Sequence, residues 1–344
     1  MGIIAAVAPN RMNREQFFRA VSGLDEDRLR KALWNLYWRG TASVRERIEA
    51  EIAGDGRSRP ARPRKPPADP ETVRWEVDEF VTLARAGAYL GGDRRVSPRE
   101  RTRWRFTFKR LATEAQDALR DADAGPAASA LEQLIDLACE ARSYDYFRSE
   151  DPVAAAGFVV SDAAAGLWAF AWERHGFQEF AQTAAPQLIR WESSYGWTRY
   201  GDGPVAAKET SLAAVLARML RVPDTWDGFA EQYLRALDSM GGRGAAKNRA
   251  RSYDDSAAQR AGALADWHGL LLDNLADTDG GLLDRIVSHA ALGGPEQKFL
   301  AARLAERRGH TDVARDLLAQ CLRKLPGHKN FREFAVEIGA PVPS

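Results

Sequence analysis

The stretch "FLAARLAERRGHTDVARDLLAQCLRKLPGHKNF", from Phe299 to Phe331, decides the fold of this chain. Its apolar residues recur at steps of three and four residues, which is the pattern of amphipathic helices. Gly309 separates two such helices, and Pro326 ends the second. A pair of helices cannot bury its apolar face alone, so we expect further helices of the same kind upstream.

Signals for helix starts and stops recur along the rest of the chain, with almost no alternating strand pattern. Ser97, Pro98 and Glu100 combine an N-cap, a proline at the first helical position and a glutamate at the third. The apolar face that follows is Trp104, Phe108, Leu111, Ala115 and Ala118. Helices are also expected over 13–53 (three short ones), 70–91, 126–141, 152–175, 177–190, 208–220, 225–239, 255–275, 281–291, 296–308, 311–324 and 329–337. The sequence therefore predicts an all-α fold.

A proline- and arginine-rich tract divides these helices into two groups. "GDGRSRPARPRKPPAD", residues 54–69, has prolines that forbid helix, negligible apolar content and like charges that repel. It predicts a linker between a small N-terminal helical module, residues 1–53, and a large all-helical domain, residues 70–344. Met1 starts a short apolar run without basic residues ahead of it, so no secretory signal is expected, and Met12 is an alternative start.

Composition narrows the class of protein. The 49 Lys and Arg residues nearly balance the 48 Asp and Glu residues. The net charge of the chain therefore gives no reason to expect binding to nucleic acid or to an anionic membrane. The two cysteines, Cys139 and Cys321, are far apart, which disfavours a disulfide framework and fits a reducing compartment. The apolar run 153–172 is interrupted by Ser161 and Asp162 and predicts core helices rather than a membrane span. We expect a soluble cytoplasmic protein.

The C-terminal unit, residues 295–326, resembles a tetratricopeptide repeat. The positions that carry the resemblance are Ala302, Gly309, Ala314, Leu318 and Pro326, with Cys321 where a small alanine is usual. Residues 104–138 give a fainter echo through Gly125, Ala130 and Leu134. The resemblance implies an irregular stack of paired antiparallel helices, of the tetratricopeptide or HEAT kind, with a groove that binds a protein or peptide. That implication is an analogy of fold, and such stacks serve many functions.

The segment "WESSYGWTRYGDGP", residues 191–204, is the most unusual part of the chain. Its aromatic rings and arginine, on a glycine-containing loop, are the residue types that anchor interfaces. The predicted contact residues for a protein partner are Trp191, Tyr195, Trp197, Arg199 and Tyr200. The alternative is a loop that fastens itself to the helices through its own rings.

A second loop, "SMGGRGAAKNRARSYDD" at residues 239–255, is rich in glycine and cations. Free backbone amides with Arg243, Lys247, Arg249 and Arg251 would suit an anion such as phosphate. The spacing does not match a P-loop. A flexible surface loop between two helices is the alternative.

Signals for catalysis are weak. His175 and Asp145 are the titratable residues around which an unrecognised active site would be sought, whereas His268, in mid-helix beside a tryptophan, is expected to be packed. No metal site or cofactor is expected. A nucleic-acid role through Arg57–Lys65 and Arg99–Arg110 is a disfavoured alternative, because the aromatic residues of the second segment lie on its apolar stripe. The sequence favours a non-catalytic scaffold that binds a protein or peptide.

Overall fold

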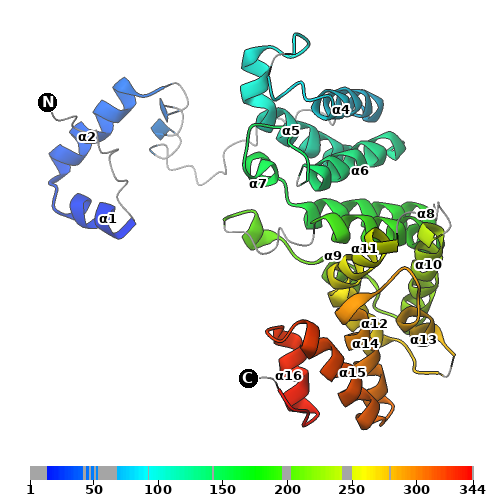
Figure 1. Cartoon of the computed structure of the whole chain (residues 1–344). Helices are drawn as coiled ribbons and strands as arrows, with labels where there is room; N and C mark the ends of the chain where they lie inside the picture. The colour runs from blue at the N-terminus through cyan, green and yellow to red at the C-terminus, as the bar shows by residue number, and fades with distance from the viewer. Residues whose placement is uncertain are drawn as a thin grey trace, which may run out of the picture. The chain divides into compact units, whose positions relative to one another are not determined.

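The computed structural model describes residues 14–41, 44–45, 48–49, 52, 68–91, 93–141, 143–195, 203–241, 250–278 and 280–342. These residues form helices joined by turns, and no strand occurs among them, so the fold is all-α (Figure 1). The chain divides into two compact units, Met1–Pro66 and Pro67–Ser344. Most of the predicted linker, residues 54–69, lies outside the described residues, so its extended structure stays a prediction.

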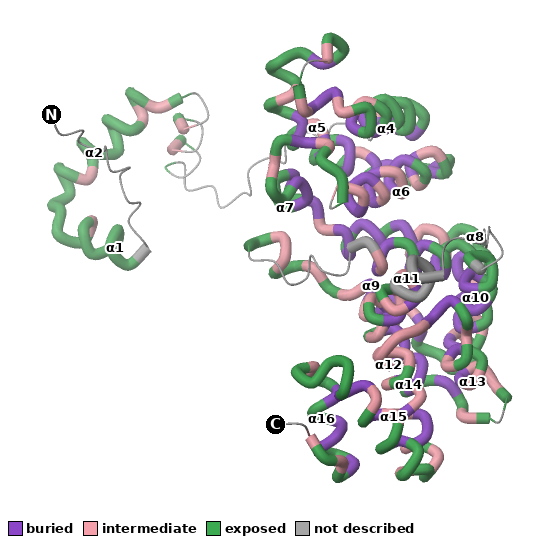
Figure 2. Tube along the Cα trace, in the orientation of Figure 1, coloured by how far each residue is buried: buried purple, intermediate pink, exposed green. Residues whose placement is uncertain are grey.

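The first unit contains α1 (Arg14–Ser22) and α2 (Glu26–Arg39). The side chain of Asp25 caps α2 by accepting a hydrogen bond from the backbone N–H of Arg28 at 2.8 Å. No residue of α2 is buried (Figure 2). The third expected helix of this unit is described only at residues 44–45, 48–49 and 52, which are helical.

The second unit begins with α4 (Pro70–Arg85), α5 (Pro98–Ala118), α6 (Gly125–Glu140) and the short α7 (Pro152–Ala156). The predicted capping box of α5 is confirmed. The Ser97 hydroxyl accepts from the Glu100 backbone N–H at 3.3 Å, and Glu100 Oε2 accepts from the Ser97 N–H at 2.8 Å. The predicted apolar face of α5 is buried against α4 and α6.

Trp75 lies on the outer face of α4. Its exposed fraction is 65%, whereas Val77 and Phe80 are buried. Two residues along a helix correspond to a rotation of about 200°, so a face that buries Val77 turns Trp75 outward.

The next element, α8 (Val160–Tyr195), consists of two arms that bend at Gly176. Gly176 has φ 80° and ψ 175°, a conformation that is open almost only to glycine. This bend is the break predicted between the helices at 152–175 and 177–190. The arms of α8 pack on α6 and on α10 (Pro223–Gly241), so α8 joins the first helices of the unit to the later ones.

The helices between α8 and the C-terminal unit are η2 (Ala206–Lys208), α9 (Leu212–Met219), α10, α11 (Ala250–Ala263), α12 (Ala265–Asn274) and α13 (Leu282–Val287). The single helix predicted over 255–275 is wrong, because the backbone leaves the helical conformation at Leu264. Leu264 and Trp267 are both buried in the core. The helix predicted over 281–291 likewise ends early, at Val287.

Residues 299–331 span most of α14 (Gly294–Arg307), all of α15 (Thr311–Lys324) and the start of α16 (Lys329–Glu337). Gly309 makes the turn with φ 79°. These three helices have a hydrophobic cluster of their own, which is separate from the main core. Cys139 is buried in the main core and Cys321 in the C-terminal cluster.

Candidate functional site

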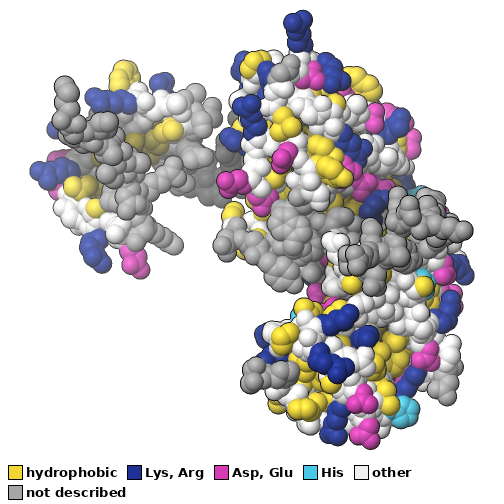
Figure 3. Space-filling view, viewed as in Figure 1, with side chains coloured by type: hydrophobic (Ala, Val, Ile, Leu, Met, Phe, Trp, Pro, Cys, Tyr) yellow, Lys and Arg dark blue, Asp and Glu magenta, His cyan; other side chains and the backbone are white. Residues whose placement is uncertain are grey.

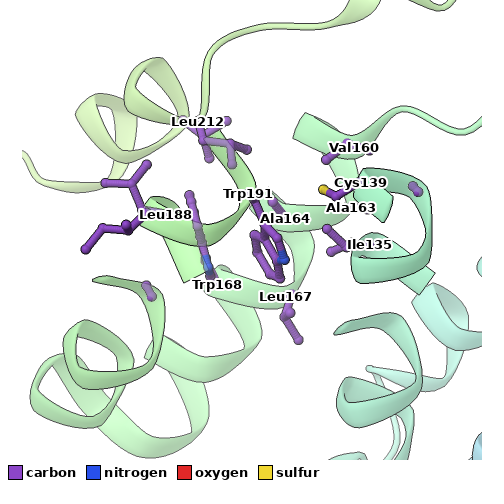
Figure 4. Close-up of a cluster of buried hydrophobic side chains, with 14 of the residues drawn as sticks. Ile135, Cys139, Val160, Ala163, Ala164, Leu167, Trp168, Leu188, Trp191 and Leu212 are labelled. Carbon is purple, nitrogen blue, oxygen red and sulfur yellow. The ribbon is translucent and has the colours of Figure 1, made fainter. Parts of the chain in front are cut away.

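Trp191 lies in the core rather than in a loop. It belongs to the second arm of α8 and is fully buried. Its Nε1 donates a hydrogen bond to Asp136 Oδ1 at 2.7 Å, and its ring stacks on Trp168 with the centroids 6.1 Å apart (Figure 4). The expectation that Trp191 contacts a partner is therefore wrong: the helix continues to Tyr195, and the pattern of α8 turns this ring inward.

Two carboxylates, one on each side of the undescribed residues 196–202, bind backbone N–H groups of neighbouring helices. On the near side, the buried Glu192 accepts from the backbone N–H of Leu212, the first residue of α9, at 2.6 Å. On the far side, the carboxylate of Glu209 accepts from the backbone N–H groups of Val160 and Ser161 at the start of α8. The backbone of Tyr195 ends α8. The side chain of Tyr195, together with Trp197, Arg199 and Tyr200, lies outside the described residues.

The predicted anion loop also falls mostly outside them. Arg243, Lys247 and Arg249 belong to the undescribed residues 242–249. Arg251 is in the first turn of α11, and only its backbone is described. The predicted anion site therefore remains a prediction.

A cleft of about 650 Å³ lies between α8, α10 and α11. We call it the α8–α10–α11 cleft; it combines four serines, two arginines and apolar side chains. Its lining residues are Ser143, Pro186, Ile189, Arg190, Ser193, Ala236, Ser239, Met240, Ser256, Gln259 and Arg260. The helices that border both segments singled out by the sequence line this cleft: α8 ends at Tyr195, α10 ends at Gly241 and α11 begins at Ala250.

The charged groups of this cleft are fixed by pairing. Arg190 forms ion pairs with Glu132 at 2.7 Å and with Asp136 at 3.0 Å. Burial raises the pKa of Asp136, although the hydrogen bond from Trp191 and the nearby Arg190 charge oppose the shift. Arg260 donates to the carbonyl oxygen of Ala291. The cleft thus has walls of defined geometry.

A second hollow of about 550 Å³, the α9–α12–α14 groove, lies on helices closer to the C-terminus. Glu296, in the first turn of α14, lines it together with Asp266 and Phe299. Burial, with a smaller contribution from the negative charge of Asp266, raises the pKa of Glu296 to about 7. His328 Nε2 lies 3.0 Å from Glu296 Oε1 and links α14 to the start of α16.

The histidines considered above lie in different surroundings. His175 contacts Glu179 on its own helix at 3.8 Å, and neither His175 nor Asp145 lines the cleft or the groove. His268 is buried, as expected; it lines the α9–α12–α14 groove, and its Nε2 lies 2.7 Å from the hydroxyl of Tyr233. Within the described ranges, no three metal-ligating side chains gather, and no helix is long and apolar enough to cross a membrane.

The surface of the second unit carries mixed charge. Figure 3 shows Lys and Arg side chains interspersed with Asp and Glu side chains on the face in view. Exposed ion pairs account for part of this pattern; Arg110, for example, contacts both Glu76 and Glu114.

Comparison with known proteins adds no relative: no family model, no curated protein and no solved structure matches this chain.

Proposed function

We propose that this protein is a non-catalytic scaffold that binds a segment of a partner protein in the α8–α10–α11 cleft. One observation carries the proposal. The two segments whose composition is typical of recognition loops are far apart in sequence, yet the helices that border them line the same cleft. Loops positioned by a rigid scaffold are where binding residues concentrate.

The lining of the cleft suits a peptide segment. Ile189, Ala236 and Met240 offer apolar contact, while the serine hydroxyls and the side chain of Gln259 supply donors and acceptors for a peptide backbone. The hydroxyl oxygen of Ser193 is buried and has no hydrogen-bond partner within the described part of the chain. An orphaned polar group of this kind favours a ligand that supplies the missing bond.

We also propose that the second unit is a degenerate helical repeat of the tetratricopeptide kind. In support, Ala302 of α14 and Ala314 of α15 are fully buried, and the two helices pack extensively on each other, as the resemblance implies. The fainter echo at 104–138 corresponds to α5 and α6, which also pack together. We further propose that the protein is cytoplasmic.

Selection of peptides from a display library against the immobilised protein tests the binding function. Ser256→Trp fills the cleft and is expected to weaken the selected peptides at least about tenfold by steric exclusion. Val336→Trp adds the same side chain at an exposed position of α16 that does not line the cleft, and it should bind like the wild type. Equal affinity in the wild type and both variants would place binding elsewhere.

The aromatic segment provides a second test of the same function. Replacing Trp197 and Tyr200 with alanine should weaken capture of the partner while the helical circular dichroism stays unchanged, because rigid aromatic residues dominate interface energies. Loss of the helical signal in this variant would instead assign the segment to the structure of the fold.

A further inference from the structure

The first unit exposes an unusual amount of apolar surface. The exposed fractions are 52% for Phe17, 54% for Phe18, 58% for Trp34, 61% for Leu36 and 68% for Trp38. Trp34 stacks on both Tyr37 and Trp38, with ring centroids 5.7 and 5.8 Å apart. Stacking orders these rings before any partner arrives, which lowers the entropic cost of binding.

The second half of α2 is apolar on nearly all sides. In "ALWNLYW", residues 32–38, Asn35 is the only side chain that is neither apolar nor aromatic. A stable helix of this composition is normally enclosed by other helices, yet no residue of α2 is buried. Within the described residues of this unit, no element encloses α2 as its composition requires.

The area of this surface falls within the range of a stable dimer interface. A fully exposed aromatic side chain offers roughly 200–250 Å² and a leucine somewhat less, so the exposed fractions of Phe17, Phe18, Leu33, Trp34, Leu36 and Trp38 add up to about 700 Å². A standard interface buries about 600–1,000 Å² on each partner.

The helices that carry this apolar surface are nearly neutral. Between Arg14 and Ile52 the sequence has eight Lys and Arg residues and seven Asp and Glu residues, a net charge of +1, whereas Arg11 and the tract 53–66 raise the charge of the whole unit to +6. The helical surface itself therefore offers little attraction to an acidic protein or an anionic membrane, and it repels a second copy of itself only weakly.

The direction of pairing follows from the ends of α2. Glu26 and Asp27 lie in its first turn and Arg39 in its last. Glu26 is paired with Arg30 of its own helix at 2.6 Å. Antiparallel α2 helices bring Asp27 of each copy towards Arg39 of the other, and the helix dipoles favour the same direction. We propose that two copies of the chain associate through α1 and α2, with the α2 helices antiparallel, and complete a small helical bundle.

Sedimentation equilibrium of the full-length chain tests this association. The wild type is expected to dimerise at micromolar concentrations, and Trp34→Ala with Trp38→Ala should raise the dimer Kd at least about tenfold. Trp75→Ala removes an equally exposed tryptophan from α4 and should leave the Kd unchanged. A wild type that stays monomeric, including one that instead binds phosphatidylserine vesicles or DNA, or a Kd unaffected by the double substitution, would overturn the proposal.

A charge exchange tests the antiparallel arrangement without removing apolar surface. Asp27→Arg and Arg39→Asp should each weaken the dimer by placing like charges together, and the two combined should restore it. A combined variant that is weaker than either single variant would exclude antiparallel α2 helices. Circular dichroism of every variant checks that its helices are retained.

Discussion

At the scale of single residues, the buried pair of Tyr233 and His268 makes stability depend on pH. Burial lowers the pKa of His268 to about 4, so this side chain stays neutral in the fold at pH values where the unfolded chain protonates it, below about 6.5. Stability should therefore fall as the pH drops from 6.5 towards 4, by at most about 1.4 kcal/mol per pH unit. His268→Gln should lose this slope in urea unfolding series, and a slope identical to that of the wild type would contradict the assignment.

Glu296 should produce a slope of the opposite sign. Its pKa of about 7 exceeds the ordinary value of 4.5, so between these limits the folded chain keeps a proton that the unfolded chain has released. The stabilising contribution of this carboxyl is complete below pH 4.5 and is lost as the pH rises through 7.

Glu296→Gln removes that loss. At pH 8 we expect the variant to be more stable than the wild type by roughly 1–3 kcal/mol, with no such gain at pH 4. The amide can still hydrogen-bond to His328, and Asp266 stays in place, so the comparison isolates the Glu296 charge. Equal stability of the two proteins at pH 8 would show that Glu296 is not held protonated.

At this scale, the sequence predicted the surroundings of some residues correctly and those of others wrongly. The packed state of His268 and the inward face of α5 follow from local periodicity and are confirmed. Trp191 was misassigned because the next residues, Glu192 to Ser194, are polar and look like a loop, whereas Glu192 is polar in order to cap α9. A tertiary cap of this kind leaves no signal in a single sequence.

At the scale of elements, the bend of α8 rests on one glycine. Gly176→Ala would force a side chain into a left-handed, extended conformation and should cost about 1–3 kcal/mol of unfolding free energy. Gly166→Ala, in the first arm of the same helix, is the matched control. A Cβ at Gly166 meets no atom within 4 Å, so this change should be neutral or stabilise by up to about 1 kcal/mol. Chemical denaturation measures both, and equal effects would contradict this role of Gly176.

Elements with local start signals were predictable, and one without a local stop signal was not. Proline at the first helical position marks α4, α5 and α7, which begin where the sequence places or nearly places them. Gly262 lies in the last turn of α11, but the turn itself is at Leu264, and the apolar pattern continues through it.

At the scale of the whole molecule, the buried apolar side chains of the described chain all lie between Pro70 and Ile338. We therefore expect a truncated chain that begins at Pro67 to fold. In dilute solution, its thermal midpoint should lie within about 4 °C of that of the full-length chain, because a shift of that size in a domain this large corresponds to only about 1–2 kcal/mol. A much lower midpoint in differential scanning calorimetry would contradict this.

The candidate cleft could not be predicted as a unit. Its lining comes from segments around residues 143, 186–193, 236–240 and 256–260, which only the tertiary fold brings together. The sequence indicated the two flanking segments by their composition, but not that the helices bordering them line one cleft.

The two buried cysteines can report on local unfolding of this protein. Burial raises the pKa of Cys321 to about 11 and holds that of Cys139 well above its usual value, so neither thiol reacts readily while its surroundings stay closed. Alkylating reagents should mark each sulfur only after transient exposure, and peptide mapping tells the two marks apart. Since one thiol reports on the main core and the other on the α14–α16 cluster, their relative labelling rates reveal which opens first.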